Sequence, residues 1–208
     1  MKNLKFLRGL NMAIILFISI LFFPCLVNGQ TKGTFVDTRD NRVYAWVKIG
    51  SQTWMAENLK YDAKVGSWAY NNDSTNVPTF GRLYNWKTAQ ASCPKGWRVP
   101  SDKEWGALIQ AYGGGGEAGL RMIETDTVVK VRGHAVLPGG TPYSTLLGGI
   151  RHPDGSCIGL NYWGGCWSSG KVNDTVANTY LFAHGRKDLG VSTNDKSAGF
   201  TVRCVKAK

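Results

Sequence analysis

The chain has 208 residues, 43% of them hydrophobic, and its 25 basic and 14 acidic residues give a formal net charge of +11. This charge is compatible with an anionic partner such as an acidic polysaccharide, a lipid or teichoic phosphate, or a nucleic acid. The basic residues are scattered, however, and nowhere form a stripe of Lys and Arg. We therefore expect a solvated basic surface and no nucleic-acid partner.

The N-terminal segment carries the pattern of an export signal. Lys2, Lys5 and Arg8 make a basic start, and residues 12–23 follow without a charge. This apolar run is shorter than the roughly 20 residues that a membrane-spanning helix needs, and it is typical of a secretory signal peptide. We therefore predict a signal peptide over residues 1–29. An uncleaved N-terminal anchor is the alternative.

Cleavage before Gln30 would leave residues 30–208. The leader takes three basic and no acidic residues with it, so the charge falls from +11 to +8. The remaining length suits a single domain. We expect this domain to be secreted, either at the cell surface or in the periplasm.

Cys25 offers a second kind of attachment, a lipid anchor on its thiol. A lipoprotein signal has a small residue immediately before the modified cysteine. Here Phe22, Phe23 and Pro24 precede it, which disfavours lipid anchoring at Cys25. After the leader, no segment is long and apolar enough to cross a membrane, so we predict no transmembrane segment in the mature protein.

The first elements of the mature chain are expected to be strands. Residues 34–50 alternate apolar and polar side chains and contain a turn signal at Asp40-Asn41, which predicts a β-hairpin. Residues 52–59 are compact and mostly apolar and predict a short strand followed by a bend. Residues 62–80 are rich in Asn, Asp, Ser, Gly and Pro and predict an exposed loop.

Two helices are predicted next. The first covers residues 83–92 and ends before Cys93-Pro94, because a residue that precedes proline avoids helical geometry. The second starts at a capping box of Ser101 and Glu104 and stops at the glycines of residues 113–116. Its apolar stripe, at i, i+3, i+4 and i+7, consists of Trp105, Leu108, Ile109 and Tyr112.

The rest of the chain is expected to consist of a short helical piece over 117–124 and then strands and turns, because glycines recur every few residues. Residues 198–205 predict a closing strand. Its alternation places three side chains inward, Phe200, Val202 and Cys204, and three outward, Thr201, Arg203 and Val205.

Four cysteines remain after the leader, Cys93, Cys157, Cys166 and Cys204, and an even number in an exported chain predicts two disulfides. Spacing alone leaves three pairings open. We favour Cys157–Cys166 as a local loop and Cys93–Cys204 as a tie between the middle of the domain and its last strand. A zinc site is the competing interpretation. The chain has no Cys-x-x-Cys pair and only three widely separated histidines, so we predict no metal.

Catalytic signatures are sparse. The chain has no phosphate loop, dinucleotide-binding glycine motif, His-Glu-x-x-His or Gly-x-Ser-x-Gly, so we predict no cofactor and no catalytic residue. His134, His152 and His184 lie far apart, with no serine or thiol nucleophile beside them. The acidic residues could include a glycosidase-like pair, but most lie in turn-like contexts.

Tryptophan is abundant, with eight residues, all after the leader. Buried indoles can form a core, whereas exposed ones can stack on sugar rings. We assign five of them to the core, Trp54, Trp86, Trp97, Trp105 and Trp167. Trp68 and Trp163 lie in asparagine- or glycine-rich segments and are the candidates for exposure.

Several segments together resemble one protein family. Residues 93–102 read Cys-Pro-Lys-Gly-Trp-Arg-Val-Pro-Ser-Asp, and the other matching segments are 47–59, 81–86, 137–140, 167–169 and 199–205. They are similar to the Fibrobacter succinogenes major paralogous domain, a family of exported bacterial surface domains. The resemblance covers residues 36–206, with its motifs in the right order.

The resemblance implies an α+β, C-type-lectin-like fold, with a small mixed or antiparallel sheet, two helices, a long irregular loop region and two disulfides. It also implies the Cys93–Cys204 closure and the Cys157–Cys166 staple. Calcium-dependent lectins of this class carry Glu-Pro-Asn or Gln-Pro-Asp and Trp-Asn-Asp. Neither occurs here, since residues 140–143 read Gly-Thr-Pro-Tyr and Trp167 is followed by two serines. This departure puts a calcium site in doubt.

In such folds the long loop region, here 140–165, builds the binding face. Its planar rings and polar groups could stack on and hydrogen-bond a ligand. The candidates are Tyr143, Arg151, His152, Asp154, Asn161, Tyr162 and Trp163.

Three functions follow as hypotheses. The first is a non-catalytic domain that binds glycan or another cell-surface polymer. The second is a protein–protein interaction or surface-assembly module that uses the same loops. The third is an enzyme, because one lectin-like branch oxidises sulfatase cysteines with paired thiols. We set the enzyme aside because both predicted disulfides would leave no thiol available.

Overall fold

The computed structural model describes residues 31–123, 130–131, 134–135, 143 and 145–207. The predicted leader and Cys25 lie outside these residues, and so does most of the segment between 124 and 144. Within the described residues the chain forms two five-stranded sheets, two small two-stranded sheets and several short helices. The predicted mixed helix-and-sheet class is confirmed.

The first sheet is antiparallel and has the order β1-β2-β3-β14-β6. Its strands are β1 (Lys32–Asp37), β2 (Arg42–Ile49), β3 (Gln52–Met55), β6 (Trp97–Arg98) and β14 (Val205–Lys206). The predicted N-terminal hairpin is confirmed: β1 pairs with β2, and Asn41 in the turn has a positive φ of 59°. Asparagine tolerates this left-handed geometry, which explains why the turn forms there.

The second sheet comes from the glycine-rich half of the chain and has the order β10-β9-β11-β12-β13. Its strands are β9 (Gly148–Arg151), β10 (Cys157–Leu160), β11 (Trp163–Lys171), β12 (Val176–Ala183) and β13 (Gly190–Asp195). The β9–β11 contact is parallel and consists of the pair Gly164 and Gly149, whereas the other pairs are antiparallel. The hairpin of β9 and β10 therefore pairs with the rest of the sheet through Gly149 and Gly164.

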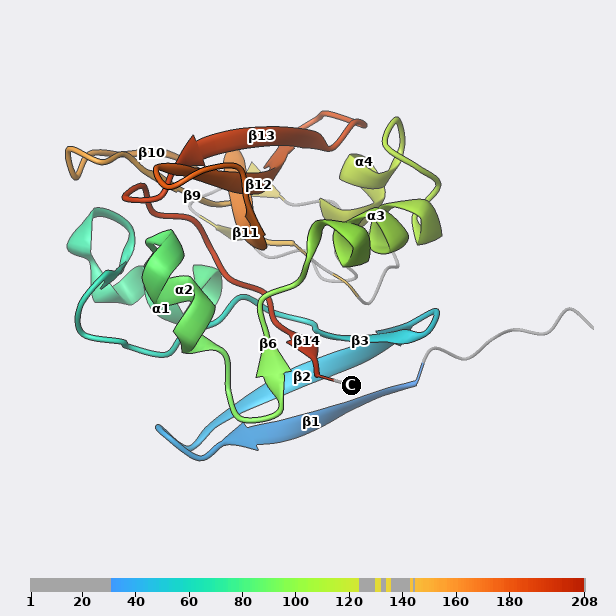
Figure 1. The fold of residues 1–208 in the computed structure, drawn as a ribbon, viewed down its shortest axis with the longest axis horizontal. Helices are drawn as coiled ribbons and strands as arrows, with labels where there is room; N and C mark the ends of the chain where they lie inside the picture. The colour runs from blue at the N-terminus through green and yellow to red at the C-terminus, as the bar shows by residue number, and fades with distance from the viewer. Residues whose placement is uncertain (1–30, 124–129, 132–133, 136–142, 144, 208) are drawn as a thin grey trace, which may run out of the picture.

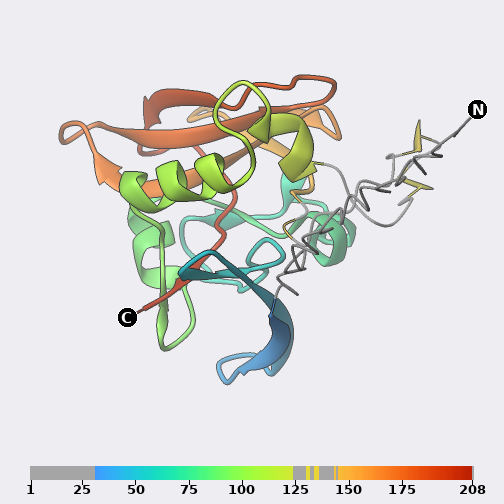
Figure 2. The same cartoon turned by 90° about the vertical axis from the view of Figure 1, so that its right-hand side faces the viewer.

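The two small sheets pair β4 (Ser67–Trp68) with β5 (Leu83–Tyr84) and β7 (Lys130–Val131) with β8 (His134–Ala135). In both views the two large sheets lie at opposite ends of the molecule, with helices between them (Figures 1 and 2). Within the described part of the chain, no helix combines the length and the apolar character that a bilayer crossing requires.

The predicted loop over 62–80 contains short helical turns. These are two 3-10 helices, η1 (Tyr70–Asn72) and η2 (Ser74–Asn76), and the α-helix α1 (Val77–Phe80). The predicted helix over 83–92 starts later than expected, as α2 (Trp86–Ser92), because Leu83 and Tyr84 pair with β4. The Asn85 side chain accepts a hydrogen bond from the Thr88 amide at 2.8 Å and caps α2.

Helix α3 (Asp102–Ala111) confirms the predicted capping box. The Ser101 hydroxyl accepts from the Glu104 amide, and the Glu104 carboxylate accepts from the Ser101 amide at 2.9 Å. Arg98 donates to the same carboxylate at 2.6 and 2.7 Å. Burial disfavours the charged carboxylate, but these hydrogen bonds outweigh it and lower the pKa of Glu104 to about 2. After the glycines, α4 (Ala118–Ile123) replaces the helical piece expected over 117–124.

The core is aromatic. Trp105 on α3 stacks on Tyr180 of β12 at 4.7 Å between ring centroids and contacts Trp54 of β3 at 5.1 Å. A second cluster contains Trp167, which meets Phe200 edge-on at 4.8 Å. Trp54, Trp105 and Trp167 are fully buried, and Trp86 and Trp97 are partly buried against the second cluster, as predicted. Of the two candidates for exposure, Trp163 is exposed and Trp68 is partly buried.

Residues 198–205, which we call the closing segment, enter the interior, and the predicted alternation of this segment is wrong. Thr201, Arg203 and Val205 were expected to point outward, but all three are buried. The segment lies between the two sheets, where both of its sides are covered, and Phe200 bridges to Tyr84 while Thr201 bridges to Cys166. The Arg203 guanidinium donates to the Asn58 side chain at 3.0 Å and covers the Tyr143 ring at 4.3 Å.

One predicted disulfide is confirmed and the other is wrong. Cys93 is bonded to Cys204, but Cys157 and Cys166 are free thiols, so the described residues hold one disulfide instead of two. Cys157 lies on β10 and Cys166 on β11, and β9 separates these strands. Cys166 is buried with its sulfur 3.2 Å from the Thr201 hydroxyl, while Cys157 lies near the surface and accepts from the Asn71 amide at 3.5 Å.

Candidate functional site

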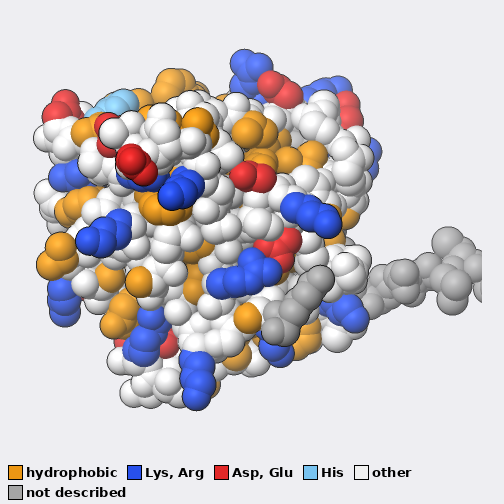
Figure 3. Space-filling view, in the orientation of Figure 1, with side chains coloured by type: hydrophobic (Ala, Val, Ile, Leu, Met, Phe, Trp, Pro, Cys, Tyr) orange, Lys and Arg blue, Asp and Glu red, His pale blue; other side chains and the backbone are white. Residues whose placement is uncertain are grey.

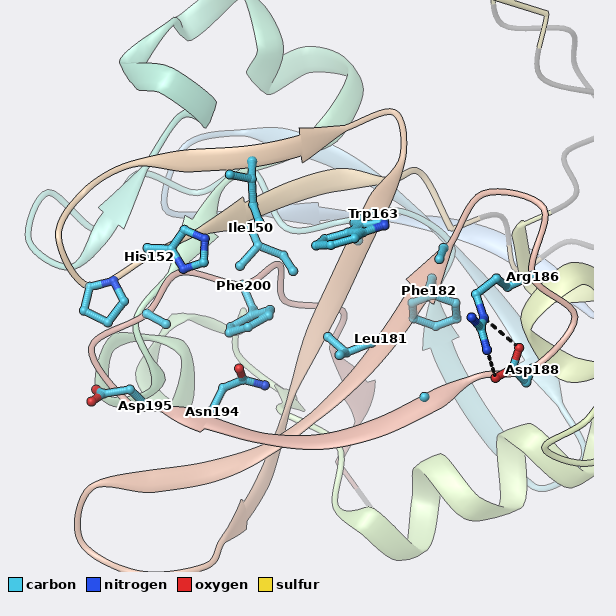
Figure 4. A pocket seen from close by; sticks show the side chains of 16 residues that line it. Ile150, His152, Trp163, Leu181, Phe182, Arg186, Asp188, Asn194, Asp195 and Phe200 are labelled. Carbon is cyan, nitrogen blue, oxygen red and sulfur yellow. Dashed lines mark hydrogen bonds and ion pairs between the residues drawn. The ribbon is translucent and has the colours of Figure 1, made fainter.

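A half-open groove with a volume of about 530 Å³ lies on one face of the second sheet (Figure 4). The β9–β10 hairpin forms one wall, and β12 and β13 form the other. The start of β11 and the closing segment complete it, through Trp163 and Phe200. Its size falls within the range of about 300–1,000 Å³ typical of ligand pockets.

The groove exists because β12 has two apolar faces. Tyr180 and Phe182 point toward α3 and pack near Trp105. Successive residues of a strand point to opposite faces, so Leu181 points the other way. On that side the closing segment covers only part of the sheet and leaves Leu181 half-buried at the floor of the groove.

The floor of the groove is apolar and its rim is polar. The apolar side chains Ile150, Leu181 and Phe200 face one another across the floor, with Trp163 at one side (Figure 4). The polar side chains stand around them, and they are His152, Arg186, Asp188, Asn194 and Asp195. Such a surface suits a ligand that presents both an apolar face and hydrogen-bonding edges.

Hydrogen bonds hold the rim in place. Arg186 donates to both carboxylate oxygens of Asp188 at 3.0 and 2.9 Å, and this hydrogen bond lowers the pKa of the Asp188 carboxyl. The side-chain amide of Asn194 donates to the Thr179 hydroxyl at 2.6 Å. Asp195 accepts from the backbone amide and the hydroxyl of Ser197, both at 2.7 Å, and these bonds lower the pKa of its carboxyl.

A second, shallower hollow of about 560 Å³ adjoins the groove and shares Ile158 and Trp163 with it. We call it the tyrosine hollow, because Tyr70 and Tyr162 line it together with Asn71, Gly159 and Leu160. None of its lining residues carries a charge. Trp163 is 48% exposed and Tyr162 is 63% exposed, so both residues are accessible to a ligand.

The structure brings some of the predicted site residues together. His152 and Trp163 line the groove, and Tyr162 and Trp163 line the tyrosine hollow. Asn161 has a positive φ of 67° and forms the tight turn that presents these two rings. This part of the predicted site is a contiguous surface.

Besides Asn161, three predicted site residues line neither depression. Tyr143 is fully buried and meets Trp54 edge-on at 5.7 Å, so it belongs to the core and presents no surface to a ligand in this structure. Arg151 covers the Trp68 ring at 4.0 Å. Asp154 is exposed at the tip of the β9–β10 hairpin, where it accepts hydrogen bonds from Ser156 and forms the turn.

Sequence reasoning missed the wall formed by β12 and β13. Leu181, Asn194 and the Arg186–Asp188 pair lie outside the predicted 140–165 region and reach the groove only through sheet pairing. The available signal was the apolar run over 180–183, which is too apolar for a strand with one solvent face and is followed by a charged turn.

Positive charge does not concentrate in the groove, where Arg186 is paired with Asp188. In the view of Figure 3, basic side chains are scattered among acidic and apolar ones. Among the residues that the structure describes, no three His, Cys, Asp or Glu side chains come close enough together to hold a metal ion.

The model of the Fibrobacter succinogenes major domain matches residues 47–206. The chain belongs to this family. The Fibrobacter succinogenes major domain here runs from β2 to the last residue of β14 and includes the disulfide, the groove and the tyrosine hollow. No curated protein and no solved structure matches the chain.

Proposed function

We propose that the protein is an exported, non-catalytic binding domain that recognises glycan or another cell-surface polymer at the groove and the tyrosine hollow. The observation that carries this proposal is Trp163, a half-exposed indole that lines both depressions. An exposed aromatic ring provides a flat apolar surface at a low cost in conformational entropy.

The chemistry of a sugar ring matches this surface. A pyranose has a C–H face that packs on an aromatic ring, and hydroxyls around its edge that exchange hydrogen bonds. The apolar floor of the groove can take the face, and the amide of Asn194 and the paired groups of Arg186 and Asp188 can serve the hydroxyls.

Export is part of the proposal and draws support from the disulfide. Cys93 and Cys204 are bonded, and such bonds persist in oxidising compartments outside the cytoplasm. This agrees with removal of a leader over residues 1–29. We also propose that the fold is of the C-type-lectin-like class, on the basis of the family and of the combination of short helices with two sheets.

An enzyme that uses paired thiols remains disfavoured, although the reason is no longer that all four cysteines are disulfide-bonded. The expected disulfides would have left no thiol, but Cys157 and Cys166 are free. They lie on strands that β9 separates, and Cys166 is fully buried, so the two cannot act as a pair at one surface site.

A protein partner is the second candidate, and the aliphatic side chains that line the groove favour it. Ile150, Ile158 and Leu181 could receive apolar side chains of an extended segment, while the polar rim lies around them. Binding to a purified surface protein but to no glycan would favour this candidate over the first.

The test is a glycan array together with a pull-down on insoluble polysaccharides, with the oxidised mature protein. We expect binding that is lost in the double variant Tyr162→Ala/Trp163→Ala. The control is Val172→Ala, because Val172 is 56% exposed and lines neither depression. Undiminished binding by the double variant would remove these two rings from the site, and no binding to any glycan would refute the glycan proposal.

A further inference from the structure

We infer that the ligand is an uncharged chain of at least two linked sugar rings that crosses Trp163, with one ring in the groove and the next in the tyrosine hollow. This inference rests on the proposed function and narrows it. It excludes a terminal monosaccharide and an acidic polymer as the preferred ligand.

The continuity of the two depressions is the first argument. They share Ile158 and Trp163, so one wall separates them and that wall is partly an aromatic ring. Each depression is as large as a separate ligand pocket. A single sugar ring can occupy only one of them, whereas a linked chain can occupy both and stack where it crosses the indole.

The backbone holds the aromatic rings in place, which is the second argument. Gly159 has a φ of 77°, and a Cβ there would lie 3.0 Å from the Trp163 Cβ and 3.3 Å from its Cγ. Gly149 has a φ of 72°, and a Cβ there would lie 2.4 Å from the Tyr70 ring. The two rings therefore lie directly against backbone that only glycine leaves open, and this packing pre-organises the surface.

The turn that carries Tyr162 is also fixed. The Tyr162 amide donates to the Gly159 carbonyl at 2.8 Å, and the Tyr162 carbonyl accepts from the His184 amide at 2.8 Å. The Tyr162 ring contacts the His184 ring at 5.8 Å between centroids. An exposed ring on a fixed backbone loses little freedom when a ligand stacks on it.

The distribution of charge is the third argument. The chain carries a formal charge of +11, yet the tyrosine hollow has no charged lining residue. In the groove, Arg186 is paired with Asp188, and Asp195 is a further acidic group. The site therefore offers an acidic polymer no local excess of positive charge. The basic residues elsewhere attract such a polymer only at long range, and salt screens this attraction.

The test is calorimetric titration of the oxidised mature protein with neutral oligosaccharides of glucose, xylose, mannose and N-acetylglucosamine, from one to about six rings long. For the sugar that binds, we expect affinity to rise at least about tenfold between one ring and the longer chains and then to level off. Raising the salt from about 50 to about 500 mM should change this affinity by less than about twofold, because no ion pair forms.

Two variants separate the depressions. Tyr162→Ala removes an exposed ring that lines only the tyrosine hollow, so it should abolish the gain with chain length and spare the binding of the shortest sugar. Trp163→Ala should weaken the binding of every length by about tenfold or more. Val172→Ala is the matched control and should leave unchanged both the affinity for the shortest sugar and the gain in affinity with chain length. Urea midpoints for each variant show that the fold is intact.

The possible failures can be told apart. Equal affinity for one ring and for long chains would overturn this inference and leave the proposed glycan function standing. A preference for a polyuronate, with binding that salt abolishes, would likewise overturn this inference and leave the proposed glycan function standing. If no sugar of either kind binds while a purified surface protein does, both the inference and the glycan function are wrong.

Discussion

Cys93, at the C-terminal end of α2, is disulfide-bonded to Cys204, the residue that precedes β14, across 111 positions of sequence. The bond joins the helical middle of the chain to the segment that passes between the two sheets. It therefore holds Phe200 and Val202, which belong to the same core cluster, in the interior. Because Phe200 also lines the groove, the disulfide supports the candidate site indirectly.

Loss of this disulfide should be costly. In the double variant Cys93→Ser/Cys204→Ser we expect the free energy of unfolding to fall by about 2–5 kcal/mol, because a long loop in the unfolded chain is no longer closed. Urea denaturation followed by tryptophan fluorescence measures this. Cys157→Ser is the control and should change stability by less than about 1 kcal/mol, because Cys157 has no covalent partner. Equal midpoints for the wild type with and without reductant would contradict the prediction.

The two free cysteines should differ in reactivity. We expect a thiol reagent to modify Cys157 in the native protein and Cys166 only after unfolding. Cys157 lies near the surface, whereas Cys166 is fully buried, and burial raises the pKa of its thiol. Mass spectrometry of the labelled peptides measures the order of reaction, and Cys157→Ser should remove the native reaction. Finding a Cys157–Cys166 disulfide would contradict the structure.

The capping box of α3 should make stability depend on acid pH. The folded-state pKa of Glu104 is about 2, below its ordinary value of 4.5, so the ionised carboxylate stabilises the fold above pH 4.5. This contribution is lost as the pH falls from 4.5 toward 2. Glu104→Gln should therefore cost about 1–2 kcal/mol near neutral pH, and the difference from the wild type should vanish near pH 2.

Urea denaturation over this pH range measures the effect. Glu117→Gln is the matched control, because the ion pair between the Glu117 carboxylate and Lys187, at 3.8 Å, is exposed. We expect a change of less than about 1 kcal/mol for it at any pH. A constant difference between Glu104→Gln and the wild type down to pH 2 would show that the carboxylate charge is not what stabilises the helix.

The tryptophans should separate into core and site residues. Trp105→Ala should lower the free energy of unfolding by about 3–5 kcal/mol, because it removes a buried ring that packs on Tyr180 and Trp54. Trp163→Ala removes a half-exposed ring and should cost less than about 1.5 kcal/mol. Thermal and urea unfolding measure both. Similar losses for the two variants would mean that Trp163 supports the fold more than it serves a ligand.

Features that depend on neighbouring residues could be predicted from the sequence. The β1–β2 hairpin follows from local alternation and from an asparagine in the turn, and α3 follows from its capping box and apolar stripe. The proximity of Tyr162 and Trp163 in the candidate site was also predictable, since both residues are adjacent in sequence and lie in one tight turn. The family was recognisable because its motifs are short runs of adjacent residues.

Features that depend on distant residues were decided by the tertiary structure. Cys157 and Cys166 are close in sequence, but strand order places β9 between them. Arg203 is buried because a second layer covers the face that alternation assigns to solvent. The groove joins the β9–β10 hairpin to a wall formed by β12 and β13, which only sheet pairing brings together. Periodicity tells which residues of a strand share a face, but only packing determines whether that face meets water. Packing therefore decided the burial of Arg203 and the position of the groove, and strand order kept Cys157 and Cys166 apart.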